Sequence, residues 1–124
     1  MELEGTAFLG DADTAPGLAR GALRVESGFY EGLEWPLDRS STVIGRGRAS
    51  DLLLYEATIS RAHALVSLED GNFVVQDLGS TNGVIIQGER QDRAQLSDGD
   101  EIRMGRLTLK LRMHANPNGG EDVS

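Results

Sequence analysis

The sequence lacks cysteine, which rules out a disulfide scaffold and any thiolate metal site. No run of about 18 or more apolar residues occurs, so no segment is long enough to cross a membrane as a helix. Basic residues number only 12 against 20 acidic ones. The resulting formal net charge of −8 argues against nucleic acid as a partner, because proteins that bind duplexes carry a basic face. The chain starts Met-Glu-Leu-Glu without the basic and apolar stretches of a secretion signal, so a cytoplasmic location is expected.

The 124 residues are about the size of one domain, and polar ends flank the part that can fold. Residues 1–20 hold four acidic residues against the single Arg20, and we expect them to form a flexible acidic tail. Residues 115–124 contain the turn-forming run Asn116-Pro117-Asn118-Gly119-Gly120 and are expected to be flexible as well. A single folded domain is therefore predicted over residues 21–114.

Alternating apolar and polar residues predict β-strands in the folded part. Leu107, Leu109 and Leu111 alternate with polar residues, which indicates a strand with one buried face. No apolar pattern with helical spacing continues for long, so a long amphipathic helix is not expected. Trp35 and Phe73 are interpreted as core residues. Further strands are predicted at residues 42–44, 64–68, 73–75 and 101–104.

Glycines mark the predicted turns between these strands. The sequence has 16 of them, and glycine suits turns better than the interior of a helix or strand. Many short strands with turn signals every ten residues or so indicate an all-β fold, specifically a β-sandwich. Hairpin turns are predicted at Asp70-Gly71, Gln87-Gly88, Asp98-Gly99 and Met104-Gly105.

Three segments have residues that suit loops, and each lies at the end of a predicted strand: residues 44–48, 59–63 and 77–83. Loops gather at the two ends of a sandwich, so three loops can share one surface. Arg46, Arg48 and Arg61 concentrate positive charge there, and arginine offers a planar fork of donors that matches phosphate or carboxylate oxygens. The same segments supply three hydroxyl groups and one amide that can bond to a peptide backbone: Ser60, Ser80, Thr81 and Asn82. The pattern predicts an anion site beside a peptide-binding amide.

The order Gly45-Arg46, Ser60-x-x-His63, Thr81-Asn82-Gly83 resembles the signature of forkhead-associated (FHA) domains. The similarity covers about residues 22–112 and includes the turn and strand at 96–102. It implies an FHA-type β-sandwich of two sheets rich in antiparallel pairs, with about eleven short strands. It also implies a module that binds phosphothreonine-containing proteins or peptides through loops at one end. Such a module works in Ser/Thr kinase signalling, downstream of a kinase, and needs no cofactor and no metal.

The resemblance also assigns roles to individual residues. Arg46 matches the arginine that grips the phosphate, and Ser60 matches the serine whose hydroxyl bonds it too. Arg61 stands where members often place another phosphate-contacting side chain. Thr81 lies in the loop that completes the pocket, and Asn82 matches the asparagine that holds the peptide backbone.

Other positions of the motif are expected to support the loops. Gly45 and His63 match supporting positions, and Gly83 is interpreted as a turn glycine. Ser50 departs from the family, in which an asparagine is frequent at this place. Arg48 is interpreted as a solvated surface charge.

The same residues could in principle serve other functions. Ser60 and His63 could form a nucleophile and base, but no third group that would orient the histidine is recognisable, so an enzyme is not expected. A dinucleotide fingerprint starting at Gly45 fails because Ser50 replaces its third glycine and no helix follows. An FHA-like scaffold that binds its partners without phosphate is the alternative function. The presence of the arginine, serine and asparagine of the pocket favours phosphopeptide binding.

Thr6 is a candidate regulatory phosphosite in the acidic tail. Leu9 follows it by three residues, where FHA ligands often carry their selectivity residue. Some bacterial FHA proteins have a phosphorylatable threonine in such a tail, and the modified tail then occupies the protein's own pocket. The alternative is a tail whose threonine is never modified.

Overall fold

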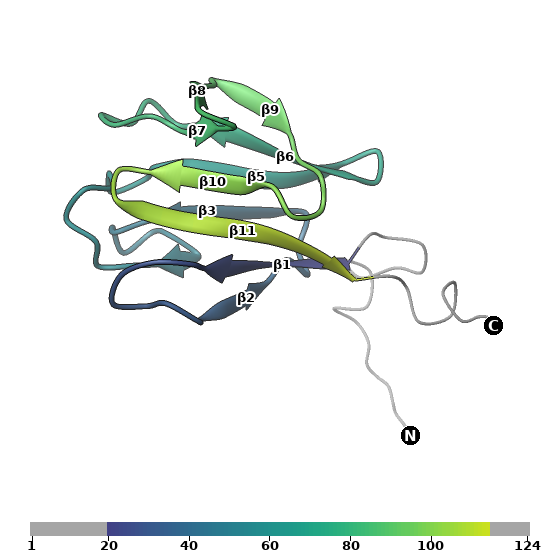
Figure 1. Ribbon diagram of the computed structural model, residues 1–124, viewed down its shortest axis with the longest axis horizontal. Coiled ribbons are helices and arrows are strands. Elements are labelled where there is room, and N and C mark those ends of the chain that lie inside the picture. The colour runs from purple at the N-terminus through teal and green to yellow at the C-terminus, as the bar shows by residue number, and fades with distance from the viewer. Residues whose placement is uncertain (1–19, 115–124) are drawn as a thin grey trace.

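The computed structural model describes residues 20–114, which form two β-sheets packed face to face (Figure 1). The eleven strands and the absence of any helix among these residues confirm the predicted all-β sandwich. The first sheet has the strand order β2 (Glu34–Pro36), β1 (Arg20–Val25), β11 (Leu107–His114), β10 (Glu101–Met104), β7 (Ile85–Ile86) and β8 (Glu89–Arg90). The second has the order β4 (Leu52–Leu53), β3 (Ser41–Gly45), β5 (Ala64–Glu69), β6 (Asn72–Asp77) and β9 (Arg93–Gln95). Arg20, assigned from the sequence to the tail, is the first residue of β1.

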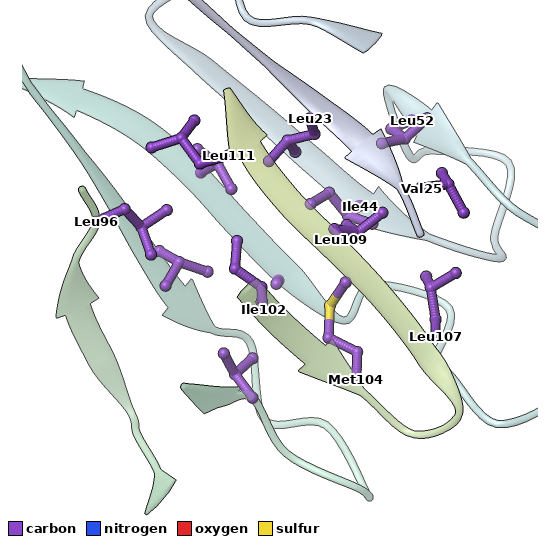
Figure 2. Packing of buried hydrophobic residues seen from close by; sticks show 14 of the residues in the cluster. Leu23, Val25, Ile44, Leu52, Leu96, Ile102, Met104, Leu107, Leu109 and Leu111 are labelled. Carbon is purple, nitrogen blue, oxygen red and sulfur yellow. The ribbon is translucent and has the colours of Figure 1, made fainter. Parts of the chain in front are cut away.

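Side chains from the facing sides of the two sheets form one hydrophobic core (Figure 2). Leu107, Leu109 and Leu111 of β11 are buried, whereas the intervening side chains are partly or fully exposed, as the alternation predicts. Phe73 is among the largest fully buried side chains, and Trp35 packs partly buried against the core. Each buried side chain of this kind contributes about 1.5–3 kcal/mol through removal of apolar surface from water.

Two of the predicted hairpin turns have the backbone that their glycines suggest. Asp70-Gly71 joins β5 to β6 with φ angles of 52° and 82°, and Gln87-Gly88 joins β7 to β8 with 55° and 81°. Left-handed φ at both central residues is typical of the tight turns that match strand twist. The hairpin predicted at Asp98-Gly99 is wrong. There the chain crosses between the sheets, because β9 pairs with β6 while β10 pairs with β11 and β7.

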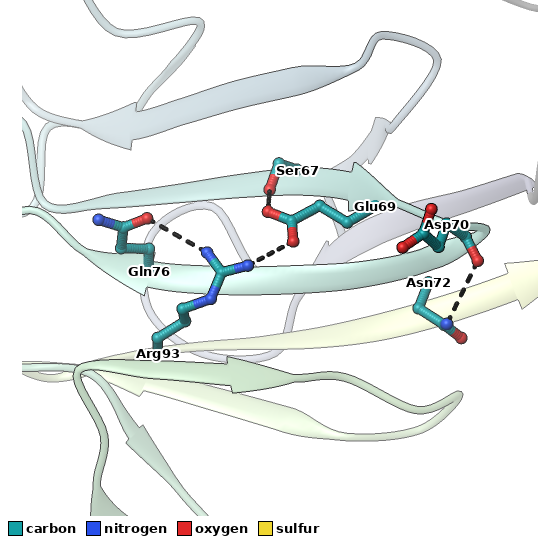
Figure 3. Close-up of polar contacts among 6 residues, drawn as sticks. All are labelled: Ser67, Glu69, Asp70, Asn72, Gln76 and Arg93. Atoms are coloured by element: carbon teal, nitrogen blue, oxygen red, sulfur yellow. Dashed lines mark hydrogen bonds and ion pairs between the residues drawn. The ribbon is translucent and has the colours of Figure 1, made fainter.

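Charged and polar side chains of β5, β6 and the edge strand β9 contact one another on the second sheet (Figure 3). Arg93 of β9 forms an ion pair with Glu69 of β5 and approaches Gln76 of β6 at 3.5 Å. Charged residues on an edge strand discourage pairing with another chain. The two charged side chains are 49% and 44% exposed, so the ion pair itself contributes about 0–1 kcal/mol.

The register of the second sheet brings the three candidate loops together at one end. Ile44 near the end of β3 lies opposite Ala64 at the start of β5, and Ala64 lies opposite Asp77 at the end of β6. The segments that follow β3, precede β5 and follow β6 therefore meet at the end of the sandwich opposite the β5–β6 turn (Figure 1).

His63 connects two of these loops from within the protein, because its side chain is fully buried. Its Nδ1 accepts the backbone N–H of Ser60 at 3.0 Å, and its Nε2 lies 2.8 Å from the carbonyl oxygen of Gly83. An imidazole that accepts at Nδ1 and donates from Nε2 is neutral. Since buried polar groups need partners, the ring fixes the spacing between the loops around Ser60 and Gly83.

We predict that His63→Ala lowers the free energy of unfolding by about 2–5 kcal/mol, because it leaves a cavity and deprives the buried Gly83 carbonyl and the partly buried Ser60 N–H of their partners. Thermal unfolding followed by circular dichroism measures the change, with the exposed neighbouring Ala62→Ser as control. Loss of ligand binding by His63→Ala at an unchanged melting temperature would contradict the supporting role.

Candidate anion-binding site

Gly45 allows the end of β3 to approach the loop before β5 very closely. A Cβ atom at this position would lie 2.0 Å from the carbonyl oxygen of Arg61 and 2.8 Å from Oγ of Ser50. The same carbonyl accepts hydrogen bonds from Gly47 N–H (3.0 Å) and from the Ser50 hydroxyl (2.9 Å). Ser50, the departure from the family pattern, therefore braces the loop itself, and only glycine fits at position 45.

The Arg46 side chain is exposed, and a hydrogen bond holds one nitrogen of its guanidinium group. Its Nε donates to the carbonyl oxygen of Ile59 at 2.6 Å, and its backbone N–H donates to Ser60 O at 3.2 Å. Among the described residues, the two terminal nitrogens have no hydrogen-bond or ion-pair partner. The chain thus positions the arginine and leaves its terminal donors to a ligand.

The hydroxyl group of Ser60 lies between the loops and is partly exposed. Its Oγ accepts the backbone N–H of Thr81 at 3.2 Å, which leaves the hydroxyl proton for another acceptor. The side chains of Thr81 and Arg61 are exposed, and no ion pair occupies Arg61 in the described part of the chain. The structure therefore gathers cationic and hydroxyl donors around Ser60.

Asn82 contributes an amide to the site from the loop after β6. Its Nδ2 donates to the carbonyl oxygen of Thr58 at 2.7 Å, while Oδ1 and the second N–H of the amide are left for a ligand. One amide can in this way form hydrogen bonds both to the protein loop and to a peptide backbone.

Thr58, which no sequence motif singles out, organises this part of the site. Its hydroxyl accepts the N–H of Arg106 at 2.9 Å and donates to the Glu56 carboxylate at 2.7 Å. That hydrogen bond, followed by the Thr58 N–H and the charge of Arg106, lowers the pKa of Glu56 below its ordinary value. No local signal predicts these contacts, because Arg106 is 48 residues away in the sequence.

Ser80 has a different role from the one predicted. It is only 8% exposed, and its hydroxyl accepts the N–H of Gly83 at 2.9 Å, so it braces the loop rather than facing a ligand. Its own N–H donates to the Asp77 carboxylate at 2.9 Å. Gly83 has a φ of 80° and lies against the Arg90 side chain, which agrees with its interpretation as a turn glycine.

The nucleophile-and-base interpretation of Ser60 and His63 does not fit the geometry. The imidazole bonds the Ser60 backbone N–H and the Gly83 carbonyl, so neither ring nitrogen is left for the Ser60 hydroxyl. No group of three or more His, Asp or Glu side chains within residues 20–114 could hold a metal ion. Nor does this part of the chain contain a helix with the length and apolar character needed to cross a membrane.

Comparison with known proteins points to one family. The model of the FHA domain matches residues 42–105. The oxoglutarate dehydrogenase inhibitor of Corynebacterium diphtheriae is 38% identical over 105 residues, which are 85% of this chain and 73% of that protein. The glycogen accumulation regulator GarA of Mycolicibacterium smegmatis is 41% identical over 87 residues, or 70% of this chain and 55% of that protein.

Solved structures give the same result. An FHA domain studied for its phosphothreonine-dependent interactions superposes with a TM-score of 0.72 at 31% identity, and covers 78% of this chain and 99% of its own. Mycobacterium tuberculosis EmbR, solved with a low-affinity phosphopeptide, gives a TM-score of 0.71 at 33% identity over 86% of this chain and 28% of its own. The motif order, the sandwich and these matches together show that the chain belongs to the FHA domain family.

Proposed function

We propose that this chain is a phosphothreonine-peptide-binding module that mediates protein interactions in Ser/Thr kinase signalling. The observation that carries the proposal is the placement of Arg46, Ser60 and Asn82 on three loops that hydrogen bonds join to one another. FHA relatives named as an inhibitor and as regulators, and FHA structures studied with phosphopeptides, support an interaction module rather than an enzyme. We expect a phosphorylated partner protein, a kinase upstream and a cytoplasmic location.

Each site residue has a role that its geometry permits. The terminal nitrogens of Arg46 and the hydroxyl of Ser60 would donate to phosphate oxygens, while Asn82 would hold the peptide backbone. Arg61 and the Thr81 hydroxyl would complete the ring of donors. A phosphate group carries about −1.5 to −2 charge and three acceptor oxygens, which this many donors can satisfy.

The alternative is an FHA-like scaffold that binds partners without phosphate. Such a scaffold has no need for an arginine whose terminal nitrogens lack protein partners and lie beside a serine hydroxyl. A site kept in this form favours the phosphate-dependent function, because unpaired cationic donors gathered in one place repel one another until an anion binds.

Arg46→Ala should weaken phosphopeptide binding by about 10- to 150-fold, since a hydrogen bond to a charged group contributes about 1.5–3 kcal/mol. Calorimetric titration with a peptide selected from an oriented phosphothreonine library measures the effect. Ser60→Ala should weaken binding less, because it removes one neutral donor and leaves the arginine in place.

Arg48→Ala is the matched control, because this exposed arginine belongs to the same loop. Arg46→Lys keeps the charge and removes the fork, and should bind between the wild type and Arg46→Ala. Unchanged affinity of Arg46→Ala would refute the assignment.

Binding should require phosphate on threonine. An aspartate in its place has less charge and a planar carboxylate, so it should bind poorly. The family implies a pocket for the threonine methyl group, so a phosphoserine peptide should bind more weakly. Competition by matched peptides against a labelled phosphothreonine peptide gives the ranking, and equal affinity for phosphoserine would argue against the methyl pocket.

A finer proposal concerns Thr6, which lies outside the described residues. A flexible chain of 14 residues, the length from Thr6 to the start of β1 at Arg20, would span about 19–22 Å, which is comparable to the radius of a small domain. Tethering brings the local ligand concentration toward the millimolar range, so phosphorylated Thr6 should weaken binding of an external phosphopeptide by about tenfold or more. Semisynthetic phospho-Thr6 protein and fluorescence polarisation test this. Equal affinity of the modified and unmodified chains would exclude self-inhibition.

A further inference from the structure

An apolar patch lies beside the anion site and has no role in the function proposed above. It consists of Phe29, Tyr30 and Leu33 in the β1–β2 turn and Tyr55 after β4. Phe29 is 94% exposed, Tyr55 is 73% exposed and Leu33 is 40% exposed. The chain has six aromatic residues, three Phe, two Tyr and one Trp, so the patch holds half of them. Exposed aromatic side chains gathered in one place mark interaction surfaces, because contact with a partner removes a large apolar area from water.

The patch is held in a defined geometry. The rings of Phe29 and Tyr30 meet edge to face with centroids 5.1 Å apart, and the Tyr30 hydroxyl accepts the backbone N–H of Tyr55 at 3.1 Å. Backbone hydrogen bonds close the turn, from Gly32 N–H to Val25 O (2.8 Å) and from Leu33 N–H to Tyr30 O (2.9 Å). The Tyr30 side chain, held in this way, loses little conformational freedom when a partner binds.

Hydrogen bonds join the patch to the anion site. Ser27 in the β1–β2 turn donates to the carbonyl oxygen of Arg106 at 3.2 Å, and the Arg106 N–H donates to the Thr58 hydroxyl. Thr58 in turn is bonded to Asn82, and all these turns lie at the same end of the sandwich (Figure 1).

The separation suits one extended ligand. Ile59 N–H bonds Glu56 O at 3.1 Å, which closes a turn whose ends are within about 7 Å. One chain step of about 3.8 Å on each side places the Cα atoms of Tyr55 and Ser60 within about 15 Å of each other. At most about five extended residues cover that distance.

Acidic residues flank the patch along the β1–β2 turn. Residues 26–34 include three glutamates and no Lys or Arg. Glu31 and Glu34 are exposed, and within residues 20–114 no cation lies at ion-pair distance from either. A segment with apolar side chains and flanking Lys or Arg residues would complement this surface.

We infer that the patch is a second contact for the phosphorylated partner, and that it binds an apolar segment with basic flanks within about five residues of the phosphothreonine. The inference rests on the proposed function, because the anion site places the ligand next to the patch. The short phosphopeptide then supplies only part of the affinity for the full partner.

The test compares a short phosphothreonine peptide with two extended forms of it. Each extended form carries Leu and Phe flanked by Lys, on the N-terminal side in one and on the C-terminal side in the other. One of them should bind the wild type about tenfold more tightly than the short peptide. The double variant Phe29→Ser/Tyr55→Ser should lose this gain and keep its affinity for the short peptide, whereas Tyr55→Phe should keep both. Replacing the flanking Lys by Glu should reduce the gain.

Several results would overturn the inference. Equal affinity of the wild type for the short and both extended peptides would do so, as would a gain that persists in the double variant. Self-association of the wild type, measured by light scattering and abolished in the double variant without any peptide gain, would assign the patch to a second copy instead. Failure of the short peptide to bind the wild type would overturn the proposed function and this inference together.

Discussion

The buried imidazole of His63 is the constraint on which the site depends. It joins the backbone of Ser60 to that of Gly83 from inside the protein, and so fixes how far apart two of the three loops lie. The third loop is held by the Arg61 carbonyl, which accepts two hydrogen bonds from it in the space that Gly45 leaves open. Because backbone groups do this positioning, the side chains of Arg46, Ser60 and Asn82 are left to face a ligand. Preorganised donors of this kind contribute affinity without an ordering cost at the moment of binding.

The charge distribution explains how an acidic chain can bind an anion. Of the 20 acidic residues, six lie in 1–19 and 115–124, so residues 20–114 have 14 acidic and 12 basic residues, a net charge of about −2. The field of the whole chain therefore does not attract phosphate, and recognition depends on short-range, charge-assisted hydrogen bonds. Under the proposed function, the guanidinium group of Arg46, rather than net charge, would select the ligand. The glutamates around the apolar patch would then select among phosphorylated partners by their basic flanks.

Much of the fold could be predicted from the sequence because its signals are local. The alternation at residues 107–111 and the Asp70-Gly71 turn depend on neighbours in the chain, and both predictions are confirmed. The strands β2 and β4 contain only three and two residues, too few to show a period, and the crossover at Asp98-Gly99 depends on which sheet each flanking strand joins. At the site, too, only features that depend on local sequence could be predicted. The order of the three loop motifs identifies the family, whereas the burial of Ser80 and the contact between Thr58 and Arg106 arise only when distant segments meet.

We propose that phosphothreonine binds where the loops after β3, before β5 and after β6 meet. Two-dimensional amide NMR of the ¹⁵N-labelled chain, titrated with a phosphothreonine peptide and with its unphosphorylated counterpart, tests it most directly. We expect the largest shifts at Arg46, Ser60, Thr81 and Asn82, and we expect them to saturate and to require the phosphate. Shifts of equal size with the unphosphorylated peptide, or shifts confined to the end of the sandwich around the β5–β6 turn, would contradict it.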